Sequence, residues 1–416
     1  MRKCTKMVMV AAVLSLLSIS SAAAGQDTDS VTISSLKELD KYSGRSGHHV
    51  KLEPGLYHLS DYLPAEKLKQ RGQSDNYYFM IFSGSNNVFD MGGVTLVVNN
   101  KLREALSAPV HRHREFVISG DGNVFKGLSI LNTGAEGINV REGSSRGGSV
   151  LSVQGDGNTL RDLTLHVEGS WPYGYGDLLG KGRNRIVGPL RKQTGLYVGG
   201  DNNRILGCSI YMRALGHGFQ LGGAKNNYFE NCYVEGEMRS TDAMLDEGPG
   251  ELAHKLDYRM QWHNRQGEQK IPPGYMQCLA EDGFRHYGGV EGSTYVNCTA
   301  KNMRHGFAMG SGTDMVKNCT ATGCETAFLV GNDIEIINSR GDAKYGPLLY
   351  LQGGKNSDIE IELMPAESDW KIHTLATIAG SNHEVTITPY EGKERDRKLP
   401  IHLGYGRPAA GKGLSS

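Results

Sequence analysis

The amino-acid sequence predicts an all-β solenoid, a fold in which short coils of the chain stack along one axis. Three segments indicate it, because they align with one another on a Gly-Phe pair and then on an Asn-Cys pair. A repeat of about twenty-two residues cannot bury its own apolar face, so it must stack on copies of itself. The aligned pairs are Gly218-Phe219, Gly283-Phe284 and Gly306-Phe307, followed by Asn231-Cys232, Asn297-Cys298 and Asn318-Cys319.

The first part of the chain predicts an export signal and then a cap. In residues 1–25, Arg2, Lys3 and Lys6 precede an apolar run and a stretch of small residues that suits cleavage. The run is shorter than the ~20 residues that span a bilayer, so we expect an exported protein, periplasmic or secreted, with no membrane span. Residues 26–77 predict an N-terminal cap with a short helix and a first strand, which would cover the open end of the stack.

Residues 78–390 predict about ten coils, each marked by a glycine, and residues 391–416 a C-terminal cap or tail. Bare coils are 21 to 26 residues long, and four intervals are longer. The extra residues all follow the second strand of one coil and precede the first strand of the next, so they share a corner and should wall a groove there. These insertions are 99–113, 135–147, 169–193 and 238–280.

The charge balance and the repeated Cys and Asn columns indicate what the protein binds and how its core is built. The 45 Lys and Arg residues balance 45 Asp and Glu residues, which gives no argument for a nucleic-acid partner. One repeat column predicts a ladder of inward thiols, while a bridge between Cys278 and Cys324 or within the ladder stays open. The preceding column predicts inward side chains that bond main-chain groups between coils. The two columns are Cys208, Cys232, Cys298 and Cys319, and Gly207, Asn231, Asn297, Asn318 and Asn338.

The coil length, the Asn turn column, the shared-corner insertions and the export signal resemble the pectate-lyase-like superfamily over residues 78–390. The resemblance implies a single right-handed parallel β-helix. It also implies a carbohydrate-active protein, although this scaffold carries lyases, hydrolases, epimerases and adhesins. The expected partner is an acidic polysaccharide or oligosaccharide, bound by a monomer.

The residue before each Gly-Phe pair carries the expected chemistry. His217, Asp282 and His305 would form one column, because stacked strands lie roughly 4.8 Å apart. β-Elimination of a uronic-acid glycan needs a cation on the carboxylate, a base for the neighbouring proton and a donor for the leaving oxygen. We expect His217 or His305 to act as base or acid, Asp282 to orient the imidazole, and Arg239 and Arg285 to neutralise the carboxylate.

Substrate contacts are expected from the aromatic and basic insertion 169–193 and from polar residues of the central stretch. Aromatic faces stack on sugar rings, and cations pair with carboxylates. The expected set is Trp171, Tyr173, Tyr175, Lys181, Arg213, Asp242, His254, Lys255, Glu281 and Arg304.

No cofactor is required by this chemistry, and Ca²⁺ is an open alternative. Asp242, Asp246 and Glu247 offer hard oxygen ligands, although their spacing is not a recognised calcium loop.

The sequence leaves two alternatives to a lyase open. A glycoside hydrolase needs two carboxylates, one of them protonated. Gly216 to Gly218 resembles the Gly-His-Gly element of polygalacturonase-type hydrolases, but that family's Asn-Thr-Asp, paired Asp and Arg-Ile-Lys elements are missing. The second alternative is a non-catalytic glycan-binding or adhesion solenoid, in which the column is only a polar stack. New reducing ends on mixed polysaccharides would separate enzyme from binder.

Overall fold

The computed structural model describes residues 30–73, 78–106, 114–134, 148–170, 173–176, 192–251, 273–366, 374–390 and 399–404. The expected export signal, the insertion 135–147 and most of the expected C-terminal tail lie outside the described residues. Within the described part, no helix is long and apolar enough to cross a membrane.

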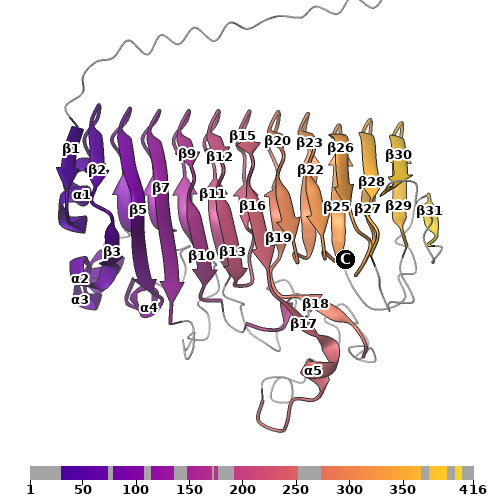
Figure 1. Cartoon of the computed structure of the whole chain (residues 1–416), viewed down its shortest axis with the longest axis horizontal. Helices are drawn as coiled ribbons and strands as arrows, with labels where there is room; N and C mark the ends of the chain where they lie inside the picture. The colour runs from indigo at the N-terminus through magenta and orange to yellow at the C-terminus, as the bar shows by residue number, and fades with distance from the viewer. Residues whose placement is uncertain are drawn as a thin grey trace, which may run out of the picture.

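The chain folds as a single right-handed parallel β-helix, which confirms the expected fold class (Figure 1). Each coil contributes to two long parallel sheets, here called sheet A and sheet B. The strands of sheet B, in spatial order, are β4 (Tyr78–Phe82), β6 (Arg114–Ile118), β8 (Gly148–Val153), β11 (Gln193–Val198), β14 (Phe219–Leu221), β19 (Asp282–His286), β22 (His305–Ser311), β25 (Thr326–Asn332), β27 (Leu349–Lys355), β29 (Ala376–Ser381) and β31 (Ile401–Leu403).

Sheet A has more strands because a turn splits it in several coils. Its strands are β1 (Ser30–Ile33), β2 (His49–Leu52), β3 (Gly55–His58), β5 (Val88–Asn99), β7 (Val124–Thr133), β9 (Thr159–Arg161), β10 (Thr164–Glu168), β12 (Arg204–Leu206), β13 (Ser209–Arg213), β15 (Tyr228–Glu230), β16 (Tyr233–Gly236), β20 (Thr294–Val296), β21 (Thr299–Lys301), β23 (Met315–Lys317), β24 (Thr320–Thr322), β26 (Glu335–Gly341), β28 (Asp358–Leu363) and β30 (Glu384–Pro389).

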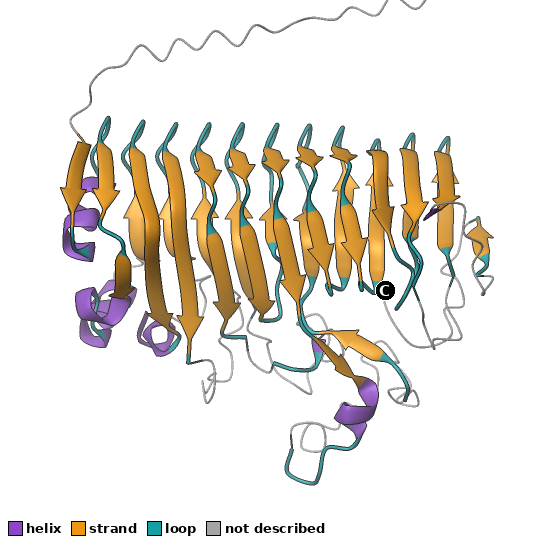
Figure 2. Cartoon of the chain, viewed as in Figure 1, coloured by secondary structure: helices purple, strands orange, loops and turns teal. Residues whose placement is uncertain are grey.

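Helices occur at the first end of the stack and along one corner (Figure 2). Helices α1 (Leu36–Ser43), α2 (Leu59–Tyr62) and α3 (Ala65–Gln73) lie beside the first coils. Ser35 caps α1 by accepting a hydrogen bond from the Glu38 main-chain N–H. Helix α4 (Lys101–Leu106), the antiparallel pair β17 (Met238–Ser240) and β18 (Met276–Cys278), and α5 (Thr241–Leu245) all lie between a sheet A strand and the next sheet B strand.

The core is built from columns of identical or similar side chains. Phe219, Phe284, Phe307 and Phe328 stack on one another with ring centroids 4.8, 4.7 and 5.5 Å apart. The expected thiol ladder is also in the core. All six described cysteines are buried and free, so the alternative of a bridge between Cys278 and Cys324, or within the ladder, is wrong.

The expectation that the Asn turn column faces inward is wrong. Asn231, Asn297 and Asn318 are exposed and have φ angles of 53 to 55°, in the left-handed region that turns the side chain outward. A different set of asparagines forms the buried ladder, in which each amide or main-chain N–H donates to the next side-chain oxygen. This set is Asn87, Asn123, Asn158, Asn203 and Asn227.

Candidate functional site

A column of glycines turns the ionisable residues of sheet B outward. A Cβ atom on Gly218 would lie 2.5 Å from Val234 Cγ2, and one on Gly283 would lie 2.8 Å from Ala300 Cβ. Both glycines therefore face the core. Because neighbouring residues of a strand face opposite sides, the residue before each inward glycine faces away from the core.

Asp282 lies at the centre of the cluster that results. Its Oδ1 is 2.7 Å from His305 Nδ1 and 2.8 Å from Arg304 Nη2. Its Oδ2 is 3.2 Å from His217 Nδ1 and 3.6 Å from Arg285 Nε. Burial by itself would raise the pKa of Asp282, but Arg304, His305 and His217 outweigh it and hold the pKa well below its usual range. Asp282 is therefore ionised although it is fully buried.

Glu281 completes the cluster beside Asp282. Its Oε1 is 2.5 Å from Lys192 Nζ and 3.2 Å from Arg304 Nη1, and its Oε2 is 3.4 Å from His217 Nε2. Burial opposes ionisation, but His217, Arg304 and Lys192 together lower the pKa of Glu281 to about 2. The two carboxylates face the three cations Lys192, Arg285 and Arg304, so the cluster carries excess positive charge when its imidazoles are neutral.

His305 differs from His217 in its surroundings. Burial lowers the pKa of His305 more than Asp282 raises it, so this imidazole is neutral at physiological pH. It contacts Asp282 through Nδ1 but does not line the cavity described below. His305 therefore helps to hold Asp282 in place.

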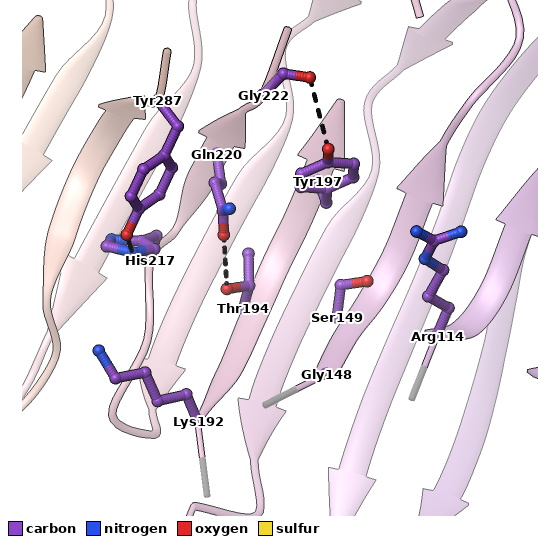
Figure 3. Close-up of a pocket in the computed structure, with 10 residues that line it drawn as sticks. All are labelled: Arg114, Gly148, Ser149, Lys192, Thr194, Tyr197, His217, Gln220, Gly222 and Tyr287. Carbon is purple, nitrogen blue, oxygen red and sulfur yellow. Dashed lines mark hydrogen bonds between the residues drawn. The ribbon is translucent and has the colours of Figure 1, made fainter. Parts of the chain in front are cut away.

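A cavity of about 380 Å³ opens on the outer face of sheet B beside this cluster (Figure 3). His217 Nε2 and Tyr287 Oη are 2.9 Å apart at one end of it. Tyr287 is 43% exposed, and the guanidinium carbon Cζ of Arg285 lies 4.6 Å from the centroid of its ring. Partial burial and the charge of Glu281 raise the pKa of Tyr287, so it keeps its proton. The lining residues are Arg114, Gly148, Ser149, Lys192, Thr194, Tyr197, His217, Gln220, Gly222 and Tyr287.

The structure thus brings together His217, Glu281, Asp282, Arg285, Arg304 and His305 from the residues proposed on sequence. Arg239 lies elsewhere, because its Nη2 is 2.5 Å from Glu247 Oε1 and its guanidinium stacks 5.3 Å from the Tyr175 ring. Arg239 is paired within the β17–α5 excursion and does not line the cavity, so the structure does not place it beside His217.

Three other expected contact residues pair with residues that do not line the cavity. Arg213 pairs with Glu168 at 3.3 Å and with Glu237 at 3.6 Å, and Tyr173 donates a hydrogen bond of 2.6 Å to Glu237. Asp242 accepts a hydrogen bond of 2.8 Å from the Gly274 main-chain N–H. Trp171, Lys181, His254 and Lys255 lie outside the described residues.

The calcium alternative finds no support in the described part of the chain. No group of three or more His, Cys, Asp or Glu side chains there is placed to hold a metal ion. Of the three candidates, Glu247 is held by Arg239 and by Tyr175, whose Oη is 3.0 Å from Glu247 Oε1. Asp246 is the C-cap of α5, and its main-chain N–H donates to the Asp242 carbonyl.

Of the ten lining residues only His217 was predicted from the sequence as a site residue, and five of the other nine have large polar side chains. Tyr287 had a usable signal, since it lies two positions after Arg285 in an extended segment and so on the same face. Of the remaining four, Gln220 directly follows the Gly218-Phe219 pair, whereas the other three come from coils without the Gly-Phe signature, so only the strand register shows that they converge. The four are Arg114, Lys192, Tyr197 and Gln220.

No protein-family model matches the sequence, and a search of curated proteins gives no significant match. Several solved structures are similar to this chain at low sequence identity. An alginate lyase from Paenibacillus sp. str. FPU-7 is 12% identical, with 82% of this chain and 96% of that chain covered and a TM-score of 0.38. A rhamnogalacturonan lyase is 11% identical, with 82% and 79% covered and a TM-score of 0.43.

The catalytic domain of an α-1,3-glucanase is 12% identical, with 92% of this chain and 58% of that chain covered and a TM-score of 0.41. Similarities this distant concern the fold alone.

Proposed function

We propose that the protein is an exported, monomeric polysaccharide lyase that cleaves an acidic, uronic-acid glycan by β-elimination in the cavity on sheet B. The observation that carries the proposal is the His217–Tyr287 pair, 2.9 Å apart at the end of a cavity that also presents Lys192. Elimination needs two proton-transfer groups and a cation for the carboxylate, and this end of the cavity offers all three.

His217 is the base in this proposal. The ionised Asp282 carboxylate lies 3.2 Å from Nδ1 and the ionised Glu281 carboxylate 3.4 Å from Nε2. The nearer charge favours the proton on Nδ1 and leaves the Nε2 lone pair to the Tyr287 hydroxyl and the cavity. The Asp282 main-chain N–H also lies 3.3 Å from Nδ1, but a full negative charge outweighs a main-chain dipole in a buried site. Nε2 would then remove the proton beside the substrate carboxylate.

Tyr287 is the acid that protonates the leaving glycosidic oxygen. Its raised pKa keeps the phenol protonated, and Oη lies within hydrogen-bond distance of the base. The charge that develops on the substrate carboxylate as the proton leaves would be stabilised by Lys192, whose side chain is 29% exposed at the cavity edge.

Hydrolysis fits the site less well. A glycoside hydrolase needs one carboxylic acid that is protonated before the reaction. Glu281 and Asp282 both have lowered pKa values, so neither carries a proton near neutral pH, and neither lines the cavity. Ionised carboxylates paired with Arg304 serve better to hold His217 than to protonate a sugar oxygen.

The test is activity on a panel of uronic-acid polymers, with wild type and His217→Ala compared. Wild type is expected to release products with the ultraviolet absorbance of an unsaturated uronate, and the variant to lose activity by about 10²- to 10⁴-fold. Arg161→Gln, an exposed change on sheet A, is the matched control. New reducing ends without that absorbance would overturn elimination, and full activity of His217→Ala would remove His217 from the mechanism.

A further inference from the structure

The cavity is long and runs across the strands of sheet B. Arg114, Ser149 and Thr194 are register partners on β6, β8 and β11, and the Gly195 N–H bonds the His217 carbonyl in the next coil. Three strand steps of roughly 4.8 Å place Arg114 about 14 Å from His217 along the axis. Figure 3 shows the two residues at opposite ends, with Thr194 and Ser149 between them. Arg114 therefore cannot contact the sugar that reacts at His217.

A flat aromatic platform lies between the two ends. A Cβ on Gly222 would lie 2.8 Å from Tyr197 Oη, and one on Gly199 would lie 3.0 Å from Tyr197 Cε1. The Tyr197 side chain therefore packs closely against Gly222 and Gly199, and its hydroxyl donates to the Gly222 carbonyl at 3.4 Å. A ring held flat against a sheet presents its face to the cavity, which is the surface on which a sugar ring stacks.

Beyond His217 and Tyr287, toward the C-terminal coils, the row of outward-facing residues on sheet B becomes buried. Tyr197, Gln220 and Arg285 are register partners on successive strands. The next two members are Ala308 and Leu329, which are 1% and 8% exposed. The open part of the row thus extends from Arg285 toward the N-terminal coils.

We propose that Arg114 forms a remote anionic subsite, which binds the carboxylate of a uronate about three sugars from the reacting bond on the N-terminal side of His217. An extended glycan advances by about one strand spacing per sugar, so a chain laid along the axis places one ring on Tyr197 and a further carboxylate at Arg114. Arg114 is exposed and has no ion pair with another residue of the described ranges, so its charge is available to a ligand. This inference rests on the proposed function for the identity of the ligand.

The experiment compares defined oligomers of mannuronate, guluronate and galacturonate, from dimers upward, on wild type, Arg114→Gln and Arg114→Lys. Wild-type kcat/KM is expected to rise when the oligomer becomes long enough to reach Arg114. On oligomers of that length, kcat/KM of Arg114→Gln should be about tenfold below wild type, because a charge-assisted hydrogen bond is removed. Arg114→Lys should keep part of the wild-type rise. Arg161→Gln should behave as wild type at every length.

Binding to His217→Ala, measured by calorimetry with the same oligomers, separates this inference from the proposed function. The subsite stands if long oligomers bind to His217→Ala and bind about tenfold more weakly to the His217→Ala/Arg114→Gln double variant. If wild type nevertheless cleaves none of these oligomers, the lyase proposal fails while the subsite stands. If the double variant binds long oligomers as tightly as His217→Ala, or if no oligomer binds, the subsite is overturned.

Discussion

His217 Nε2 and Tyr287 Oη lie 2.9 Å apart, although the two residues are joined by a long excursion that leaves and re-enters the stack. Strands β14 and β19 are sequence-distant neighbours that pair through Phe219 and Phe284, and this pairing sets the contact. The buried Asp282 holds the imidazole from the other side at 3.2 Å. The acid–base pair is thus a product of coil stacking.

The Tyr287→Phe variant tests the proposed role of the Tyr287 hydroxyl as the acid. The change removes one hydroxyl and keeps the ring that stacks on Arg285, so the fold should be unaffected while kcat falls by about 10²-fold or more. The measurement is the steady-state rate on the best uronate polymer, with thermal unfolding as the check on the fold. Tyr211→Phe, a 39%-exposed tyrosine on sheet A, should retain wild-type kcat. Unchanged kcat in Tyr287→Phe would exclude the phenol as the acid.

The inward glycine column is the second target. Gly283→Ala would place a Cβ 2.8 Å from Ala300 Cβ and 2.7 Å from the Gly306 carbonyl oxygen, so the coils must shift apart. We expect a loss of about 1–3 kcal/mol in the free energy of unfolding. Gly288→Ala is the control, since a Cβ there meets nothing within 4 Å. Equal stabilities of the two variants in denaturant titrations would contradict the inward packing of the glycine column.

The lowered pKa of Glu281 predicts how stability depends on pH. A group whose pKa falls from 4.5 to about 2 on folding stabilises the protein above pH 4.5, and this contribution is lost as pH falls from 4.5 toward 2. The melting temperature should therefore drop across that window, and Glu281→Gln should flatten the drop. Glu291→Gln removes an exposed carboxylate and should keep the wild-type slope. A Glu281→Gln profile parallel to wild type would show that the ion pairs do not stabilise the fold.

The thiol ladder predicts chemical inertness. Burial, and then the neighbouring thiols of Cys232 and Cys319, raise the pKa of Cys298 well above its usual value, so no reactive thiolate forms. The six described thiols should resist alkylation in the native protein and react after denaturation. Reductant should leave the melting temperature unchanged. A drop in the melting temperature on adding reductant would reveal a disulfide and contradict the ladder.

The sequence was most informative where one coil repeats the next. The repeating columns that begin at Gly218 and at Cys208 could be predicted because similar side chains align between stacked coils. The Asn231 column was misread, since a left-handed turn residue repeats as regularly as a core residue but faces solvent. Regular spacing therefore identifies a column without showing which way its side chains point.

The site was predicted only where it coincides with such a column. His217, Asp282 and His305 share the position before a repeated glycine, so their proximity follows from alignment. Arg114 and Tyr197 lie on coils of different lengths, and their approach depends on the register between strands, which the insertions hide in the sequence. Arg239 was misassigned because its partner Glu247 comes from a turn within the same excursion, and a contact of this kind has no repeat to predict it.

Product analysis in heavy-oxygen water tests the central claim most directly. A uronic-acid polymer that wild type cleaves is digested in this water, and the masses of the product oligomers are measured by mass spectrometry. Elimination at His217 and Tyr287 predicts unsaturated ends with no oxygen gained from water at the broken bond. Saturated products that each carry one heavy oxygen would contradict the account.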